Sequence, residues 1–151
     1  MTNVSSKDVV RRYFSEAVDK QNFAVLDELW VRDCVVHRPE IAEPIRGIDE
    51  FKRAWKKAVI DPYSKFTTTI HDLIVEGDLV SCRLSHKAVH RADWTSRLGR
   101  HAVPVGTTVS WSSITNFRIR DGKIAEEWVC RDELAMLLQL GAVTAVRQYV
   151  T

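Results

Sequence analysis

Residues 117–142, FRIRDGKIAEEWVCRDELAMLLQLGA, predict a β-hairpin that runs directly into a helix. Asp121-Gly122 favours a tight turn, because both residue types tolerate the positive φ angles that two-residue hairpin loops require. The strand that follows, residues 123–131, mixes charged side chains with apolar ones. Whether one of these charges lies inside the protein decides what the hairpin contributes to function.

The register of this hairpin determines which carboxylate faces inward. A two-residue turn pairs Thr115 with Trp128 and directs Glu126 to the inner side of the sheet. A three-residue loop with a glycine bulge pairs Thr115 with Val129 and directs Glu127 inward instead. A slip of one residue exchanges the two faces of the strand, so both registers are considered at this point.

The hydrophobic period changes from 3.6 to 2 near the middle of the chain. Helices are predicted to begin at Ser5, at Asn22 and at Ile48, with Asp132 as the N-cap of a last helix that ends before Gly141. Strands are predicted at residues 33–37, 66–76, 79–90, 107–120 and 123–131. This order predicts an α+β fold, with helices packed on one face of a curved antiparallel sheet.

Length and composition indicate one ordinary globular domain over residues 1–151. Hydrophobic residues make up 45% of the chain, charged residues 28%, and the net charge is +2. So small a charge predicts no nucleic-acid or membrane partner. The first residues lack the apolar run of a secretory signal, and the three widely spaced cysteines suggest reduced thiols. We therefore expect a cytoplasmic protein.

Five stretches resemble the SnoaL-like polyketide cyclases of the nuclear transport factor 2-like superfamily. They are VVRRYFSEAVDKQNFAVLDELWVRDCVVH (9–37), RGIDEFKRAW (46–55), IHDLIVEGDLVSCRLS (70–85), FRIRDGKIAEEW (117–128) and DELAMLLQLGA (132–142). The resemblance implies a cone-shaped sheet packed against three N-terminal helices, with a short C-terminal helix and an open pocket. It also implies a homo-oligomer, dimer or tetramer, that uses no metal and no organic cofactor.

The resemblance includes one departure at the expected site. In the studied cyclases, an aspartate on the last strand acts with a histidine on the preceding strand as the acid/base pair of an aldol closure. Counted from DGKI, these positions hold Val129 and Thr115. Valine has no exchangeable proton and a threonine hydroxyl is a very weak base, so the same aldol chemistry is not expected here. Because the family requires both positions on one face, the resemblance favours the register that places Glu127 inside.

Glu127 and three histidines are the candidate catalytic residues. His86 and His90 share one face of a predicted strand, about 13 Å apart, which is too far for two ligands of one metal ion. Either could instead act as a base or line the pocket rim, and His37 could face the cavity or anchor the following loop. Glu127 could equally lie on the outer face or at an oligomer contact.

The remaining predictions concern the pocket wall and its cover. The predicted wall consists of Phe51, Trp55, Trp111, Ser113, Thr115, Val129 and Arg131. Residues 91–106 form an unusually long connection between strands. This connection could be a lid that offers cations to an anionic substrate group, a solvated loop, or an arm that contacts another subunit.

These features predict a cofactor-independent enzyme of specialised metabolism. It would perform acid/base chemistry, as a cyclase, isomerase, dehydratase or related hydrolase, on a small apolar, polyketide-like or polycyclic substrate. Glu127 or His86 would be the base, and His37 or His90 would polarise the substrate oxygen. The alternatives are a non-catalytic small-molecule-binding protein derived from a cyclase and a protein-interaction module of the transport-factor type.

Overall fold

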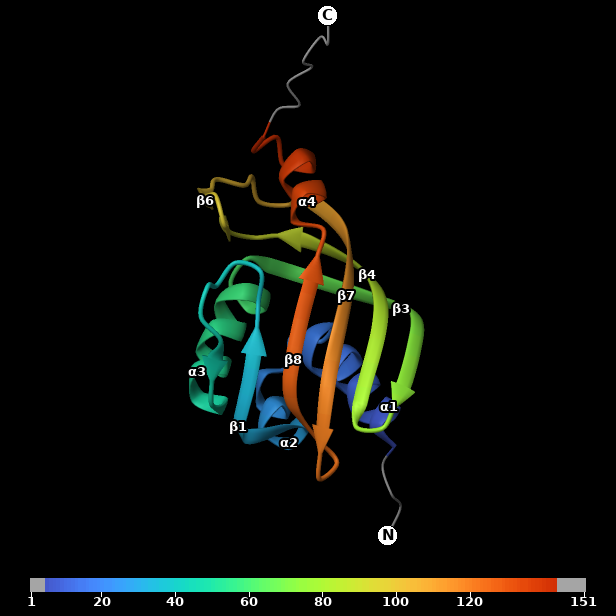
Figure 1. The fold of residues 1–151 in the computed structure, drawn as a ribbon. Coiled ribbons are helices and arrows are strands. Elements are labelled where there is room, and N and C mark those ends of the chain that lie inside the picture. The colour runs from blue at the N-terminus through green and yellow to red at the C-terminus, as the bar shows by residue number, and fades with distance from the viewer. Residues whose placement is uncertain (1–4, 144–151) are drawn as a thin grey trace, which may run out of the picture.

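A computed structural model describes residues 5–143 (Figure 1). The helical segments are α1 (Ser6–Arg12), η1 (Tyr13–Val18), η2 (Phe23–Val25), α2 (Leu26–Leu29), α3 (Ile48–Trp55), η3 (Lys56–Ile60) and α4 (Glu133–Gln139). The strands are β1 (Trp30–His37), β2 (Ile45–Arg46), β3 (Tyr63–Glu76), β4 (Leu79–His90), β5 (Trp94–Ser96), β6 (Gly99–His101), β7 (Thr108–Arg120) and β8 (Lys123–Arg131).

The main sheet has the strand order β2-β1-β8-β7-β4-β3 and curves around the N-terminal helices (Figure 1). The predicted α+β fold with a short C-terminal helix is therefore confirmed. One strand pair differs from a purely antiparallel sheet, because β1 and β8 run parallel. The long intervening chain, which contains α3 and most of the sheet, allows the two strands to run in the same direction.

The predicted helix ends are found in the structure. The Ser5 hydroxyl accepts a hydrogen bond from the backbone N–H of Asp8 at 3.2 Å, and the Asp132 carboxylate accepts one from the N–H of Ala135 at 2.9 Å. Gly141 follows α4 with a φ of 66°, a left-handed conformation that glycine adopts without strain. Asp132 thus acts as a helix cap, as its sequence position predicts.

The hairpin register pairs Thr115 with Val129, and it arises by a different route from the predicted one. The turn is the two-residue Asp121-Gly122 loop, with φ values of 52° and 73°. Arg120 pairs with Lys123 across this turn, and the register then shifts by one because Ala125 has no partner on β7. Of the two alternatives considered, the turn is the two-residue one, the favoured register is the one present, and a bulge at Ala125 in place of a three-residue loop produces that pairing.

The aromatic residues of α3 belong to the core. Phe51 packs against Trp30 with ring centroids 4.2 Å apart, and both side chains are almost fully buried. The Trp55 indole N–H donates to the Tyr13 hydroxyl at 3.1 Å. Neither Phe51 nor Trp55 lines the cavity, which corrects the predicted pocket wall. Their spacing of four residues places both side chains on the buried face of α3, where they contact Trp30 and Tyr13.

Residues 91–106 contain a small second sheet, formed by β5 and β6. Trp94 and Ser96 are buried, and the backbone N–H of Arg97 donates to the Glu133 carboxylate at 3.1 Å. This segment is thus attached to α4 by a specific contact. Across the described residues, no helix combines the length and apolarity needed to cross a membrane.

Candidate active site

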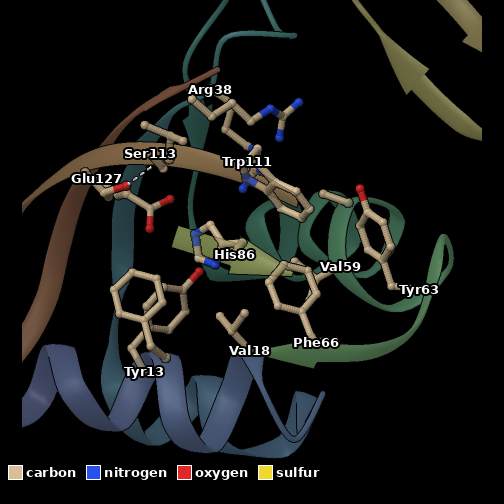
Figure 2. Close-up of a pocket in the computed structure, with 15 residues that line it drawn as sticks. Tyr13, Val18, Arg38, Val59, Tyr63, Phe66, His86, Trp111, Ser113 and Glu127 are labelled. Atoms are coloured by element: carbon tan, nitrogen blue, oxygen red, sulfur yellow. Dashed lines mark hydrogen bonds between the residues drawn. The ribbon is translucent and has the colours of Figure 1, made fainter. Parts of the chain in front are cut away.

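A cavity lies between the helical segments η1 and η3 and the inner face of the sheet (Figure 2). Its volume is about 60 Å³, room for a few water molecules or one small chemical group. Both η1 and η3 are π-helical, a widened turn that is frequent at functional sites. The lining residues are Tyr13, Phe14, Val18, Arg38, Ala58, Val59, Tyr63, Phe66, His86, Trp111, Ser113, Thr115, Glu127, Val129 and Arg131.

Glu127 is the carboxylate that lines this cavity. The residue is 2% exposed, and its Oε1 atom has no hydrogen-bond partner in the described structure. Burial raises the pKa of Glu127 to about 7, although the nearby Arg38 guanidinium partly opposes this rise. A carboxyl group with this pKa exchanges protons readily near neutral pH.

His86 lines the same cavity from β4. Its Nδ1 atom lies 3.0 Å from the Thr68 hydroxyl, and its ring packs against Phe14, Phe66 and Trp111. Burial, together with the charges of Arg131 and Arg38, lowers the pKa of His86 to about 4. The imidazole is therefore neutral at pH 7, where it can donate one hydrogen bond but not a net charge.

Tyr13 contributes a hydroxyl from η1. This oxygen already accepts the Trp55 indole N–H, which leaves the Tyr13 O–H available as a donor. Burial raises the pKa of Tyr13 well above 10, and the Glu127 charge raises it further, so the phenol stays protonated. Figure 2 shows the Tyr13 hydroxyl directed into the space that Glu127 and His86 also face.

Arg38 is a cavity residue that the sequence reasoning missed. The first strand was predicted to end at His37, before Pro39. Arg38 lay outside that prediction, although alternation from Val36 would have placed it on the inner face. The Arg38 Nε donates to Glu40 at 2.8 Å, and the Arg131 guanidinium donates to the other oxygen of Glu40 at 3.0 Å. Burial raises the pKa of Glu40, but the two arginines outweigh it and hold that pKa below its ordinary value.

Arg131 extends this chain of charges to the end of the sheet. Its guanidinium also donates to Glu133 at 3.3 Å, and Glu133 in turn holds Arg97 at 3.5 Å. A continuous ionic network therefore links the cavity wall to the segment that carries β5 and β6. Arg131 lines the cavity as predicted, but its positive charge is paired with the carboxylates of Glu40 and Glu133.

The structure places two of the four candidate catalytic residues away from the cavity. His37 lies on the outer face of the sheet, where its Nε2 is 2.9 Å from Glu126 and its ring stacks on Trp128 at 5.4 Å. His90 is fully buried beside Tyr63 and is absent from the cavity lining. Of the four, Glu127 and His86 line the same cavity, whereas His90 shares the inner face of β4 with His86 but lies beyond the cavity, beside Tyr63.

Residues 5–143 contain no group of three or more His, Cys, Asp or Glu side chains arranged to hold a metal ion. The cavity's own polar groups are instead a carboxyl, an imidazole, an indole, two phenols, two guanidinium groups and two small hydroxyls. The Ser113 and Thr115 hydroxyls lie 3.2 Å apart, and Ser113 also reaches the backbone carbonyl of Cys130 at 3.1 Å. Such a set suits proton transfer and hydrogen bonding to an oxygen atom.

Comparison with known proteins agrees with this cone-shaped fold. The family model for SnoaL-like polyketide cyclases matches residues 8–140. The chain therefore belongs to the SnoaL-like polyketide cyclase family. A search of curated proteins finds no match.

Several solved structures share the fold. IdmH from Streptomyces antibioticus, described as "a putative polyketide cyclase", is 27% identical, with a TM-score of 0.72 over 89% of this chain and 96% of that one. A "putative SnoaL-like polyketide cyclase" from Jannaschia sp. is 18% identical, with a TM-score of 0.76 over 95% and 98%. An epoxide hydrolase of the LEH-like type from M. tuberculosis is 16% identical, with a TM-score of 0.66 over 90% and 89%. The last two likenesses concern the fold alone.

Proposed function

We propose that this protein is a cofactor-independent enzyme that uses Glu127 to move a proton at carbon in a polyketide-like ketone. The observation that carries the proposal is the buried Glu127 carboxyl, with a pKa of about 7 and one unpartnered oxygen, in the wall of a small cavity. Family membership supports a cyclase-type role. Val129 and Thr115 stand where the family has its acid/base pair. We assign the role of the base to Glu127, which lies two residues before Val129 on the same face of β8.

The proposed step is enolisation. An oxygen of ionised Glu127 removes a proton from the carbon next to a ketone, the C–H electron pair becomes the enolate, and negative charge develops on the ketone oxygen. The neutral His86 N–H, the Tyr13 O–H or the Arg38 guanidinium donates hydrogen bonds to that oxygen. If the enolate is conjugated with a second double bond, return of the proton to the far carbon gives isomerisation. Attack of the enolate carbon on a second carbonyl gives ring closure, and the proton held by Glu127 passes to the new alkoxide.

The apolar surroundings explain why one carboxylate suffices. A base whose pKa lies near the operating pH combines a useful ionised fraction with a strong affinity for the proton. Phe14, Phe66 and Trp111 exclude water, which maintains the raised pKa of Glu127. Catalysis should therefore increase with pH through about pH 7, as Glu127 ionises.

Deuterium exchange tests the proposal directly. The protein is incubated in D₂O with 2-tetralone, a bicyclic ketone, and loss of the protons next to the carbonyl is followed by NMR. We expect exchange above the buffer rate, reduced by about 100-fold or more in Glu127→Gln, the low end for removal of a general base. The matched control is Glu126→Gln, the neighbouring carboxylate on the outer face. Equal exchange rates in wild type and Glu127→Gln would remove Glu127 from the role.

A second candidate function is small-molecule binding without catalysis. It is favoured by the replacement of the family's acid/base pair by Val129 and Thr115 and by the small volume of the inner cavity, about 60 Å³. It predicts that bicyclic ketones bind, as measured by calorimetry, while their exchange rates equal those of the buffer.

A further inference from the structure

A second, larger cavity adjoins the one that contains Glu127. Its volume is about 570 Å³, within the range of sites that hold drug-sized molecules. It lies between α3, the residues that follow β1, and strand β5. Its lining residues are Glu40, Ile41, Glu50, Arg53, Ala54, Lys57, Ala58, Trp94, Thr95 and Arg131.

The two cavities share part of their walls. Ala58 and Arg131 line both of them, so the larger outer cavity meets the inner one at these two residues. The inner cavity, at about 60 Å³, admits only a small group such as a ketone and the carbon beside it. A larger substrate can extend past Ala58 and Arg131 into the outer cavity, whereas a third cavity, of about 380 Å³, adjoins the inner one at His86 and Trp111.

The charges of the outer cavity are unequal in sign. Glu40 and Arg131 pair with one another at 3.0 Å and contribute no free charge. Arg53 and Lys57 have no carboxylate within 4.0 Å among residues 5–143. Glu50 is the remaining acid, and its carboxylate accepts a long contact of 3.4 Å from the backbone N–H of Arg46. The unpaired charge in the lining is thus net positive.

The positions of these two cations suit a single anionic group. Residues four apart on a helix lie on one side, about 6 Å from each other, so both side chains can reach one carboxylate. Trp94, which is 4% exposed, and the alanines of α3 and η3 supply apolar surface beside them. Arginine and lysine bind carboxylates through charge-assisted hydrogen bonds, which are stronger than neutral ones.

We infer that the outer cavity is a binding site for the carboxylate-bearing, aromatic or polycyclic end of the substrate. Arg53 and Lys57 bind the carboxylate, and Trp94 contacts the ring system. This inference builds on the proposed function, because it assigns the reactive end of the same molecule to the cavity of Glu127. It names the substrate class as ketones that also carry a carboxylate at the far end.

Calorimetric titration with 2-naphthoate tests the site, with 2-naphthol as the uncharged probe of similar shape. We expect the double variant Arg53→Gln/Lys57→Gln to bind 2-naphthoate at least tenfold more weakly, and to bind 2-naphthol as wild type does. Raising the salt concentration should weaken 2-naphthoate binding in the wild type alone. The control is Lys56→Gln, which removes one positive charge from the same helical region, at a residue that pairs with Asp61 and lies outside the cavity.

Two results would overturn the inference. One is 2-naphthoate binding that is unchanged in the double variant. The other is a loss of 2-naphthoate binding in Lys56→Gln as large as that in the double variant, which would indicate a general charge effect. Thermal unfolding of each variant verifies that the fold is retained.

The two proposals can fail separately. Enolisation is read from exchange of an uncharged ketone and depends on Glu127. Carboxylate binding is read from 2-naphthoate affinity and depends on Arg53 and Lys57. A protein that binds 2-naphthoate through these cations but exchanges no ketone proton would retain the outer site and lose the proposed function. The reverse result would retain the function and lose the outer site.

Discussion

Glu126 and Glu127 are neighbours in sequence, yet they occupy opposite faces of β8 and meet different physical conditions. Glu127 is almost fully buried, and its pKa rises to about 7. The Glu126 side chain is 26% exposed and lies between His37 and Arg118, at 2.9 and 3.7 Å. The comparison teaches that the reactivity of a carboxylate here depends on the face of the strand, and hardly at all on local sequence.

The largest expected difference between the two faces concerns their ion pairs. Glu40→Gln keeps the shape of the side chain but leaves Arg38 and Arg131, both buried, without their shared carboxylate. We expect the free energy of unfolding to fall by about 3–5 kcal/mol, as when one partner of a buried ion pair is removed. Urea unfolding at pH 7 measures the change. Glu126→Gln, on the outer face, should cost less than about 1 kcal/mol. Equal losses in the two variants would contradict the comparison.

The raised pKa of Glu127 predicts how stability depends on pH. The folded state holds this proton up to about pH 7, whereas the unfolded chain releases it near 4.5. The folded state therefore binds more protons between these pH values, and its stability falls as the pH rises from 4.5 to 7.

Glu127→Gln removes this dependence. At roughly 1.4 kcal/mol per pH unit, the variant should gain about 3 kcal/mol relative to wild type between pH 4 and pH 8. Urea unfolding at both pH values gives the double difference, with Glu126→Gln as the control on the opposite face. A difference that stays constant with pH would show that the Glu127 pKa is ordinary.

Arg38 tunes the same carboxylate, and its removal should have an intermediate effect. The guanidinium favours ionised Glu127 and so lowers its pKa. In Arg38→Gln, the midpoint of the pH–rate profile for ketone exchange should move upward by about one pH unit, the usual size of one opposite charge. Arg118→Gln, the corresponding change beside Glu126, should leave the midpoint in place. A downward movement in Arg38→Gln would refute this account of the site.

The smallest effect is expected for His37→Gln. This change removes the contact with Glu126 and the stacking on Trp128, both on the partly exposed outer face. The cost in unfolding free energy should be below about 1 kcal/mol, and the exchange rate of the ketone should stay as in wild type. A tenfold loss of exchange would mean that His37 acts on the cavity after all.

Most of the fold could be predicted from sequence because its signals are local. β4 and β8 lie at their predicted limits, since apolar and polar side chains alternate strongly in β4 and the Asp121-Gly122 turn and the Asp132 cap bound β8. The caps at Ser5 and Asp132 follow from residue type and position. The hairpin of β5 and β6 was not predicted, because its burial depends on the distant contact between Arg97 and Glu133.

The site was predictable only in part, for a related reason. Glu127 and His86 followed from strand alternation once a register was chosen. His37 differs because β1 pairs with β8 such that Val36 lies opposite Glu127, which turns His37 outward. Arg38 and the outer cavity depend on ion pairs between residues that are far apart in the sequence, such as Glu40 and Arg131. No local sequence pattern predicts such pairs.

The unpaired residue Ala125 has a consequence for comparing this protein with its relatives. The hairpin tip is a regular two-residue turn, and the shift in pairing occurs between it and Glu127. A relative with the same turn but no bulge would present the residue aligned with Glu126 to its cavity, although the two sequences align without a gap. Equivalent catalytic positions in such relatives must therefore be matched through strand pairing, because counting residues from the turn identifies the wrong neighbour.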